Sequence, residues 1–171
     1  LRIRDANSIF SLADAIAVSP TVRSVVQARY RGTNWGTSIS GVTPGFLTVK
    51  GWELDEGKFF TEADVIGAAH LCVLGKTVAK ELFGLTKIIG ETIIIKGLAC
   101  RIIGVLSEKG ASAWGSDMDD TILAPITTVQ RKILGINHIQ RIEVLTSSRD
   151  AAFSIQDEIR VLLRKNHQLR K

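Results

Sequence analysis

The chain has 171 residues, of which 45% are hydrophobic and 23% charged, enough for one globular domain with a sizeable core. Its formal net charge of +5 lies in residues 160–171, which hold five basic side chains and no acid, so the body is neutral and we expect no nucleic-acid partner. No apolar run reaches the roughly 18 residues of a membrane-spanning helix, and no signal-peptide pattern opens the sequence, so we expect a soluble piece, processed or excised from a longer protein.

The first third of the chain predicts a helix followed by a hairpin. Apolar residues at helical spacing indicate a helix over residues 8–18, which Ser19-Pro20 would end. Alternating β-branched and polar residues indicate a strand over 22–30, a turn over 31–36 and a returning strand over 37–42. This hairpin would expose Trp35 at its tip, and an irregular region would follow as far as Asp64.

The rest of the chain alternates strands and helices. The predicted strands cover residues 70–74, 91–96, 99–107, 121–124 and 139–146, and the second and third of these form a hairpin around Gly97. Helices are predicted over 76–83 with Gly84 as the stop, from Pro125, and from Ala151 into the basic tail. A loop of small residues over 109–119 carries Trp114 and Met118.

This order predicts an α+β fold in a single domain over residues 1–171. The two chain ends would form a mixed βαβ-type lobe, and a β-rich lobe would be inserted between them. We place the approximate sublobes at 1–34 plus 121–171 for the α/β part and at 35–120 for the β-rich insertion.

No motif in the sequence predicts catalysis, a cofactor or a metal. Gly75-Lys76-Thr77 follows a strand and opens a helix, but the position where a phosphate-binding loop needs its first glycine is His70. The cluster Asp117, Asp119 and Asp120 lacks the closing Glu of a calcium loop, and we interpret it as turn chemistry. The three histidines lie far apart in sequence, and no strained serine turn supports a catalytic triad.

Two cysteines, Cys72 and Cys100, lie in apolar strand-like runs. We interpret them as free buried thiols, while a disulfide between neighbouring strands stays open as the alternative in an oxidising compartment.

The aromatic residues predict where a partner protein binds. Trp52, Phe59 and Phe60 lie in a turn-rich stretch, where large side chains hold loops against a core. Trp35 and Trp114 lie among small polar residues, and an exposed Trp on a loop tip is typical of a protein-contact anchor. We therefore predict four partner-binding residues: Trp35, Asn34, Trp114 and Met118.

Several motifs carry a resemblance to a known family. Residues 41–65 read GVTPGFLTVKGWELDEGKFFTEADV, and Val73-Leu74-Gly75, Glu81-Leu82-Phe83-Gly84 and the strand Cys100–Leu106 also look like segments of that family. The set, with Gln130-Arg131 and the segment from Ile159 to His167, resembles the periplasmic core domain of MacB-like (FtsX-like) ABC-transporter permeases over most of residues 15–167.

The resemblance implies a periplasmic (extracytoplasmic) domain of an inner-membrane protein, between the first and second membrane helices of a permease. Such a domain is no enzyme: it would couple ATP-driven motion to export and dock an adaptor (membrane-fusion) protein. The implied partners also include a second permease copy and an ATPase domain or subunit, and no cofactor is implied. An FtsX-type or lipoprotein-release-type domain that binds another periplasmic partner is the alternative, and a stand-alone hydrolase using His70 or His138 is an alternative of another class.

Overall fold

A computed structural model describes residues 1–168 of the chain. The helices are α1 (Ile3–Phe10), α2 (Gly45–Lys50), α3 (Glu62–Ile66), α4 (Lys76–Phe83), α5 (Ile126–Thr128) with the π-helix η1 (Val129–Leu134), and α6 (Arg149–Asn166). The strands are β1 (Ala17–Tyr30), β2 (Thr33–Val42), β3 (Leu54–Gly57), β4 (Leu71–Leu74), β5 (Thr92–Ile95), β6 (Leu98–Leu106), β7 (Ile122–Pro125) and β8 (Arg141–Leu145). The fold is α+β, as predicted.

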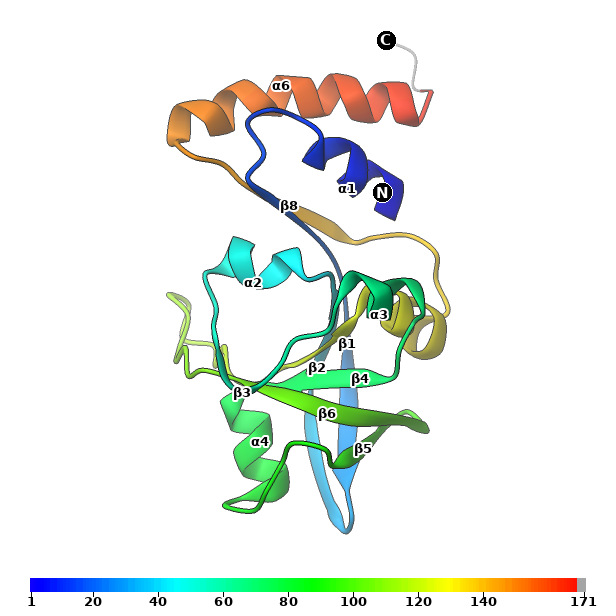
Figure 1. The fold of residues 1–171 in the computed structure, drawn as a ribbon, viewed down its shortest axis with the longest axis vertical. Helices are drawn as coiled ribbons and strands as arrows, with labels where there is room; N and C mark the ends of the chain where they lie inside the picture. The colour runs from blue at the N-terminus through cyan, green and yellow to red at the C-terminus, as the bar shows by residue number, and fades with distance from the viewer. Residues whose placement is uncertain (169–171) are drawn as a thin grey trace.

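Six strands form a closed ring of hydrogen-bonded neighbours in the order β1, β2, β7, β4, β6, β5 and back to β1. The pairs β2–β7 and β4–β6 are parallel and the other four pairs are antiparallel. The main hydrophobic cluster is built largely from apolar residues of these strands. Trp52 and Phe60 are buried in it and the half-buried Phe59 packs against it, as predicted for residues that hold the turn-rich stretch against the core. Figure 1 shows the ring in the lower part of the molecule, with α4 beside it.

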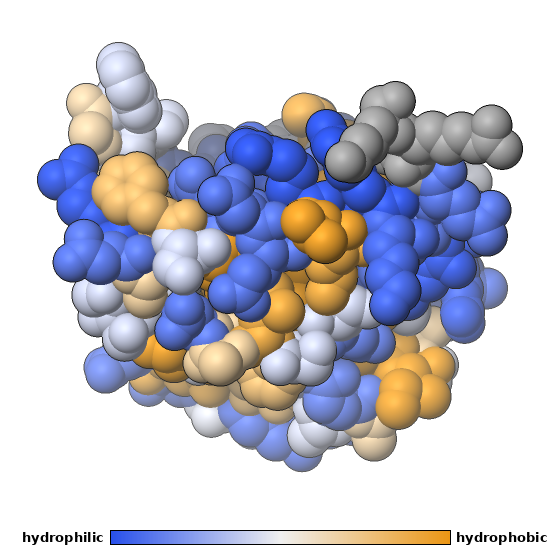
Figure 2. Space-filling model, turned by 90° about the horizontal axis from the view of Figure 1, so that it is seen from above, coloured by the Kyte–Doolittle hydropathy of each residue, from blue (hydrophilic) through white to orange (hydrophobic). Residues whose placement is uncertain are grey.

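The chain ends form a separate end lobe, which consists of α1, residues 17–21 of β1, β8 and α6. β8 pairs antiparallel with the start of β1, with Ala17 opposite Leu145. Ala6, Ile9 and Val18 form a small second hydrophobic cluster, onto which the inner face of α6 packs. Helices α1 and α6 therefore both lie at the upper end of Figure 1, and Figure 2, which looks down on this end, shows apolar patches separated by hydrophilic side chains.

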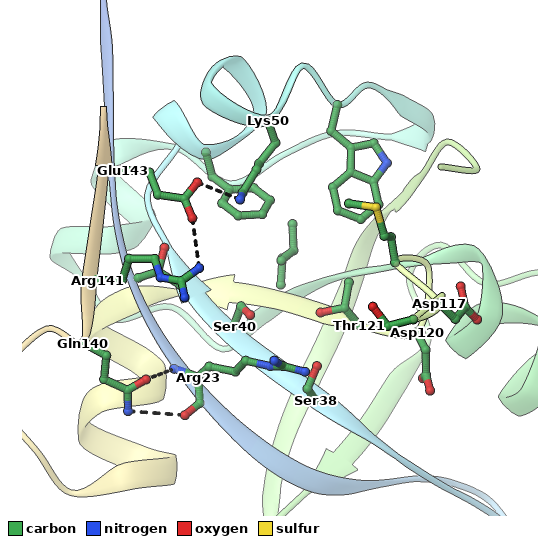
Figure 3. Close-up of a pocket in the computed structure, with 16 residues that line it drawn as sticks. Arg23, Ser38, Ser40, Lys50, Asp117, Asp120, Thr121, Gln140, Arg141 and Glu143 are labelled. Carbon is green, nitrogen blue, oxygen red and sulfur yellow. Dashed lines mark hydrogen bonds and ion pairs between the residues drawn. The ribbon is translucent and has the colours of Figure 1, made fainter. Parts of the chain in front are cut away.

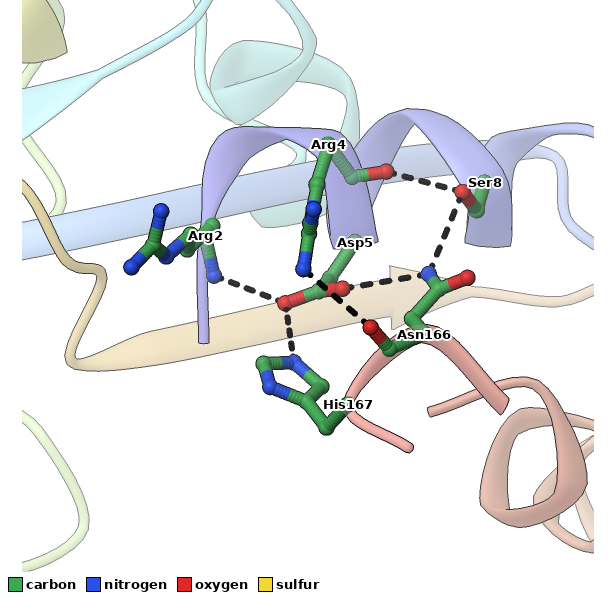
Figure 4. Close-up of polar contacts among 6 residues, drawn as sticks. All are labelled: Arg2, Arg4, Asp5, Ser8, Asn166 and His167. Atoms are coloured by element: carbon green, nitrogen blue, oxygen red, sulfur yellow. Dashed lines mark hydrogen bonds and ion pairs between the residues drawn. The ribbon is translucent and has the colours of Figure 1, made fainter. Parts of the chain in front are cut away.

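A network of polar contacts joins α1 to the end of α6 (Figure 4). The buried Asp5 carboxylate accepts the backbone N–H of Arg2 at 2.8 Å and the side-chain amide of Asn166 at 3.1 Å, and it contacts His167 Nε2 at 2.8 Å. Burial alone would raise the pKa of Asp5, but the hydrogen bonds from His167, Arg2 and Asn166 together hold this pKa below its ordinary value. The network thus joins Asp5 to Asn166 and His167, which lie 161 and 162 positions further along the chain.

The prediction of a helix over residues 8–18 is wrong. The helix covers Ile3–Phe10, and Ala17 already belongs to a 14-residue strand that runs through Pro20. Pairing of residues 17–21 with β8 decides this conformation, and local spacing does not report a partner more than 100 residues away.

The hairpin and the lobe boundaries also differ from the prediction. The β1–β2 turn is at Arg31-Gly32, and Trp35 lies within β2 opposite Ala28, so its expected place at the tip is wrong. β7 lies between β2 and β4, which places residues 122–125 in the ring and not with the end lobe. Strands β4 to β8 and helices α4 and α6 lie within a few residues of their predicted positions, whereas α2, α3 and β3 occupy the stretch predicted as irregular.

Candidate functional site: a projecting arm and a cleft

The loop between β6 and β7 contains an arm, which we define as residues 109–118. Its two sides are joined by the Ser112 N–H, which donates to the Ser116 carbonyl at 2.8 Å, and by the Met118 N–H, which donates to the Gly110 carbonyl at 3.0 Å. The hydroxyls of Ser112 and Ser116 lie 2.7 Å apart, and Ala111 forms a β-bridge with Asp117. The arm is therefore an ordered turn with its own hydrogen bonds.

Carboxylates hold the base of the arm. Asp119 is buried and accepts the backbone N–H groups of Lys109 at 2.8 Å and Gly110 at 2.9 Å. Asp117 accepts the Thr77 hydroxyl at 2.5 Å, which ties the arm to the start of α4. The acidic cluster thus supplies turn and anchoring contacts, and within residues 1–168 no group of three or more His, Cys, Asp and Glu side chains is arranged to hold a metal ion.

The four predicted partner-binding residues lie in different settings. Trp114, at the end of the arm, is 96% exposed, whereas Met118 at its base is half-buried. Asn34 is exposed on β2, near the turn of the hairpin. Trp35 is half-buried, and its indole N–H donates to Asp120 Oδ1 at 2.9 Å, so it supports the base of the arm from the neighbouring strand. Figure 1 shows the arm at the side of the ring and the hairpin turn at its lower end, so the four residues do not form one tip.

The start of α4 is occupied by the protein's own backbone. The Gly75 N–H donates to the Thr121 carbonyl at 2.9 Å, and the Thr77 N–H donates to the Asp119 carbonyl at 3.2 Å. A Cβ at position 75 would lie only 2.1 Å from the Asp119 oxygen. Glycine is needed here for close backbone approach, and the N–H groups of Gly75 and Thr77 already have backbone partners and are not free to bind a phosphate.

A cleft of about 440 Å³ lies between the end lobe and the ring, on the inner side of the arm (Figure 3). One wall comes from β8 and the end of α2, the floor from β1 and β2, and the other wall from the base of the arm and β7. Its main polar lining residues are Arg23, Ser38, Ser40, Lys50, Asp117, Asp120, Thr121, Gln140, Arg141 and Glu143.

Ion pairs form the wall nearest the end lobe. Glu143 Oε2 lies 2.6 Å from Lys50 Nζ, and Glu143 Oε1 lies 3.4 Å from Arg141 Nη1. Burial raises the pKa of Glu143, but the hydrogen bond and charge of Lys50, followed by those of Arg141, outweigh it and lower the pKa below 4.5. The Lys50 ammonium also lies 6.0 Å from the centre of the Phe46 ring.

None of Arg23, Lys50 or Glu143 was singled out from the sequence. They come from three elements widely separated in the chain, and each stands alone among ordinary neighbours, so no local pattern marks them. The pairing of β8 with the start of β1, and the packing of α2 against both strands, bring them to one cleft.

The cysteines are buried, whereas His70 and His138 lie on the surface. Cys72 and Cys100 are free buried thiols, as we interpreted them from the sequence. Burial raises the pKa of both thiols, that of Cys100 to about 11, which disfavours the reactive thiolate. His70 and His138 are exposed, and no hydrogen bond within residues 1–168 pairs either imidazole with an acid.

Comparison with known proteins decides the family. The sequence model of the MacB-like periplasmic core domain matches residues 1–162. The chain belongs to this family. The macrolide export ATP-binding/permease protein MacB of Wolinella succinogenes is 37% identical over 163 residues, which cover 95% of this chain and 25% of that protein.

Two crystal structures share the fold of this family member. The periplasmic region of MacB from Actinobacillus actinomycetemcomitans matches with a TM-score of 0.84 and 25% identity, over 98% of this chain and 75% of that one. The extracellular domain of the noncanonical ABC-type transporter YknZ from Gram-positive bacteria matches with a TM-score of 0.85 and 24% identity, over 99% of this chain and 86% of that one. At this level of identity the match supports the fold alone.

Membership of the MacB-like family identifies the chain as an extracytoplasmic domain of an ABC-transporter permease. The chain spans about a quarter of the length of the curated relatives it matches. No helix within residues 1–168 is both long and apolar enough to cross a membrane.

Proposed function

We propose that this domain couples ATP-driven motion of its permease to export, and that it docks an adaptor protein through the arm. The Wolinella relative is named as a macrolide export protein with an ATP-binding part, which supports export as the activity that the domain serves. A second permease copy and an ATPase domain or subunit complete the transporter in this proposal.

The observation that carries the docking proposal is the exposure of Trp114 on an ordered support. A side chain that is 96% exposed contributes little to its own fold, and burying a Trp against a partner supplies a large apolar area at a low cost in conformational entropy. The hydrogen bonds between the two sides of the arm fix the position of this side chain before a partner arrives, which reduces the entropy lost on binding.

The test uses the full-length permease with its adaptor. We expect Trp114→Glu to lower adaptor-dependent export and adaptor co-purification by about tenfold or more, because a charge replaces an anchor at the interface. Leu85→Glu is the matched control, since Leu85 is also fully exposed but lies beyond the far end of α4. Unchanged export in a folded Trp114→Glu permease would refute the docking role of the arm.

A photo-crosslinking amino acid at position 114 separates this proposal from the alternative partner. A crosslink to the adaptor in cells supports the proposal. A crosslink to a lipoprotein or to a regulator of a cell-wall hydrolase would replace adaptor docking with the alternative function.

A further inference from the structure

The floor of the cleft contains polar side chains that the protein leaves without partners. The hydroxyls of Ser38, Ser40 and Thr121 border the cleft, and within residues 1–168 none of them takes part in a hydrogen bond. Ser38 is only 6% exposed, and it lines the cleft. Ser40 and Thr121 are half-buried, and three hydroxyls without protein partners along one cavity give a polar ligand several hydrogen-bonding groups.

An arginine side chain lies over the same floor. The backbone of Arg23 is fixed by Gln140, whose Oε1 accepts the Arg23 N–H at 2.9 Å, but the guanidinium makes no ion pair or hydrogen bond with any residue in the described part of the chain. Figure 3 shows this side chain reaching across β2 toward Ser38. A guanidinium presents a planar fork of donors that matches a carboxylate.

The wall formed by the base of the arm carries negatively charged side chains. Asp120 uses Oδ1 to accept the Trp35 indole at 2.9 Å and the Thr37 hydroxyl at 2.7 Å, and these bonds orient the carboxylate at the edge of the cleft. Asp117 lies beside it on the same wall (Figure 3). The lining of the cleft therefore combines a guanidinium, two carboxylates and the aromatic side chains of Phe46 and Trp52.

We propose that this cleft binds a small zwitterionic ligand of the amino-acid or short-peptide class. Its carboxylate would bind Arg23 and the hydroxyls of Ser38 and Ser40, its ammonium group would face Asp120, and an apolar side chain would pack toward Phe46. A dianion such as phosphate fits less well because Asp120 would repel it. The cavity of about 440 Å³ is within the usual size of small-molecule sites.

The test titrates the 171-residue chain with the dipeptide Ala-Phe and follows backbone amide shifts by NMR. We expect saturable shifts at Ser38, Ser40 and Thr121. Ala-Phe amide, which lacks the carboxylate, and N-acetyl-Ala-Phe, which lacks the ammonium group, should each bind about tenfold more weakly, because each leaves one charged wall unpaired. Equal shifts with all three peptides, or no saturable shift with Ala-Phe, would overturn the proposal.

Variants assign the binding to the cleft. Arg23→Gln should weaken Ala-Phe binding about tenfold without unfolding the chain, because among residues 1–168 the exposed guanidinium makes no hydrogen bond or ion pair. Arg29→Gln is the matched control on the same strand, where the side chain is exposed and outside the cleft, and it should bind as the wild type does. Equal affinity of the two variants would also overturn the proposal. Trp114→Glu should bind Ala-Phe normally, so the outcome does not depend on adaptor docking.

Discussion

The indole N–H of Trp35 donates to Asp120 Oδ1 at 2.9 Å, and this contact joins β2 to the residue that follows the arm. The Thr37 hydroxyl donates to the same oxygen at 2.7 Å. One carboxylate oxygen thus connects the central strand ring to both the arm and the wall of the cleft. A residue that the sequence marked as a contact anchor therefore has a structural role.

Replacing Trp35 tests this role. Trp35→Phe keeps an aromatic ring but removes the donor, and we expect the free energy of unfolding in urea to fall by about 1 kcal/mol, the net value of one such hydrogen bond. Trp114→Phe is the control and should change the stability by less than about 0.5 kcal/mol, because that side chain is exposed. Equal effects of the two changes would contradict a supporting role for Trp35.

Gly75 is required by a close approach of two backbones. Gly75→Ala would place Cβ 2.1 Å from the Asp119 carbonyl oxygen, so we expect a loss of roughly 1–3 kcal/mol in unfolding free energy. Gly32→Ala is the matched control, because no atom lies within 4 Å of the added methyl group. If Gly75→Ala unfolds at the same denaturant concentration as Gly32→Ala, the close packing of α4 on the Asp119 segment is wrong.

Asp5 should make the stability of the chain depend on pH. Its pKa is lower in the folded state than its ordinary value of 3.8, so its stabilising contribution is complete above about pH 4 and is lost as the pH falls through the lower folded pKa. We expect Asp5→Asn to lose roughly 1–3 kcal/mol at neutral pH, and the difference from wild type to shrink below pH 4.

The measurement for Asp5 is urea unfolding across the acid range. Asp14→Asn serves as the control, because the Asp14 carboxylate takes part in no hydrogen bond or ion pair among residues 1–168, and its effect should be small at every pH. A difference between wild type and Asp5→Asn that stays constant down to pH 2 would argue against the contacts with His167 and Asn166.

The two buried thiols should resist alkylation in the folded chain. With a pKa of about 11 for Cys100, only about one thiol in a thousand is ionised near pH 8, and burial further limits access. We expect slow reaction with a thiol reagent in buffer and rapid reaction of two thiols per chain in denaturant. Finding no reactive thiol in denaturant would show a disulfide between Cys72 and Cys100.

The sequence by itself determined the features that depend on near neighbours and on general hydrophobic pattern. The helix after Gly75 with its stop at Gly84, the hairpin around Gly97 and the burial of Trp52 and Phe60 all follow from turn residues and apolar spacing within short segments. The motif from Gly41 to Val65 likewise indicated the family that the comparisons establish.

The tertiary structure decided the features that depend on contacts between distant segments. Residues 17–21 became a strand because β8 pairs with them, and Trp35 became a supporting residue because Asp120, 85 positions away, lies beside it. The cleft exists only where β8, β2 and the base of the arm meet. Local propensities differ by less than the free energy of such long-range pairing and burial, so the folded context overrides them.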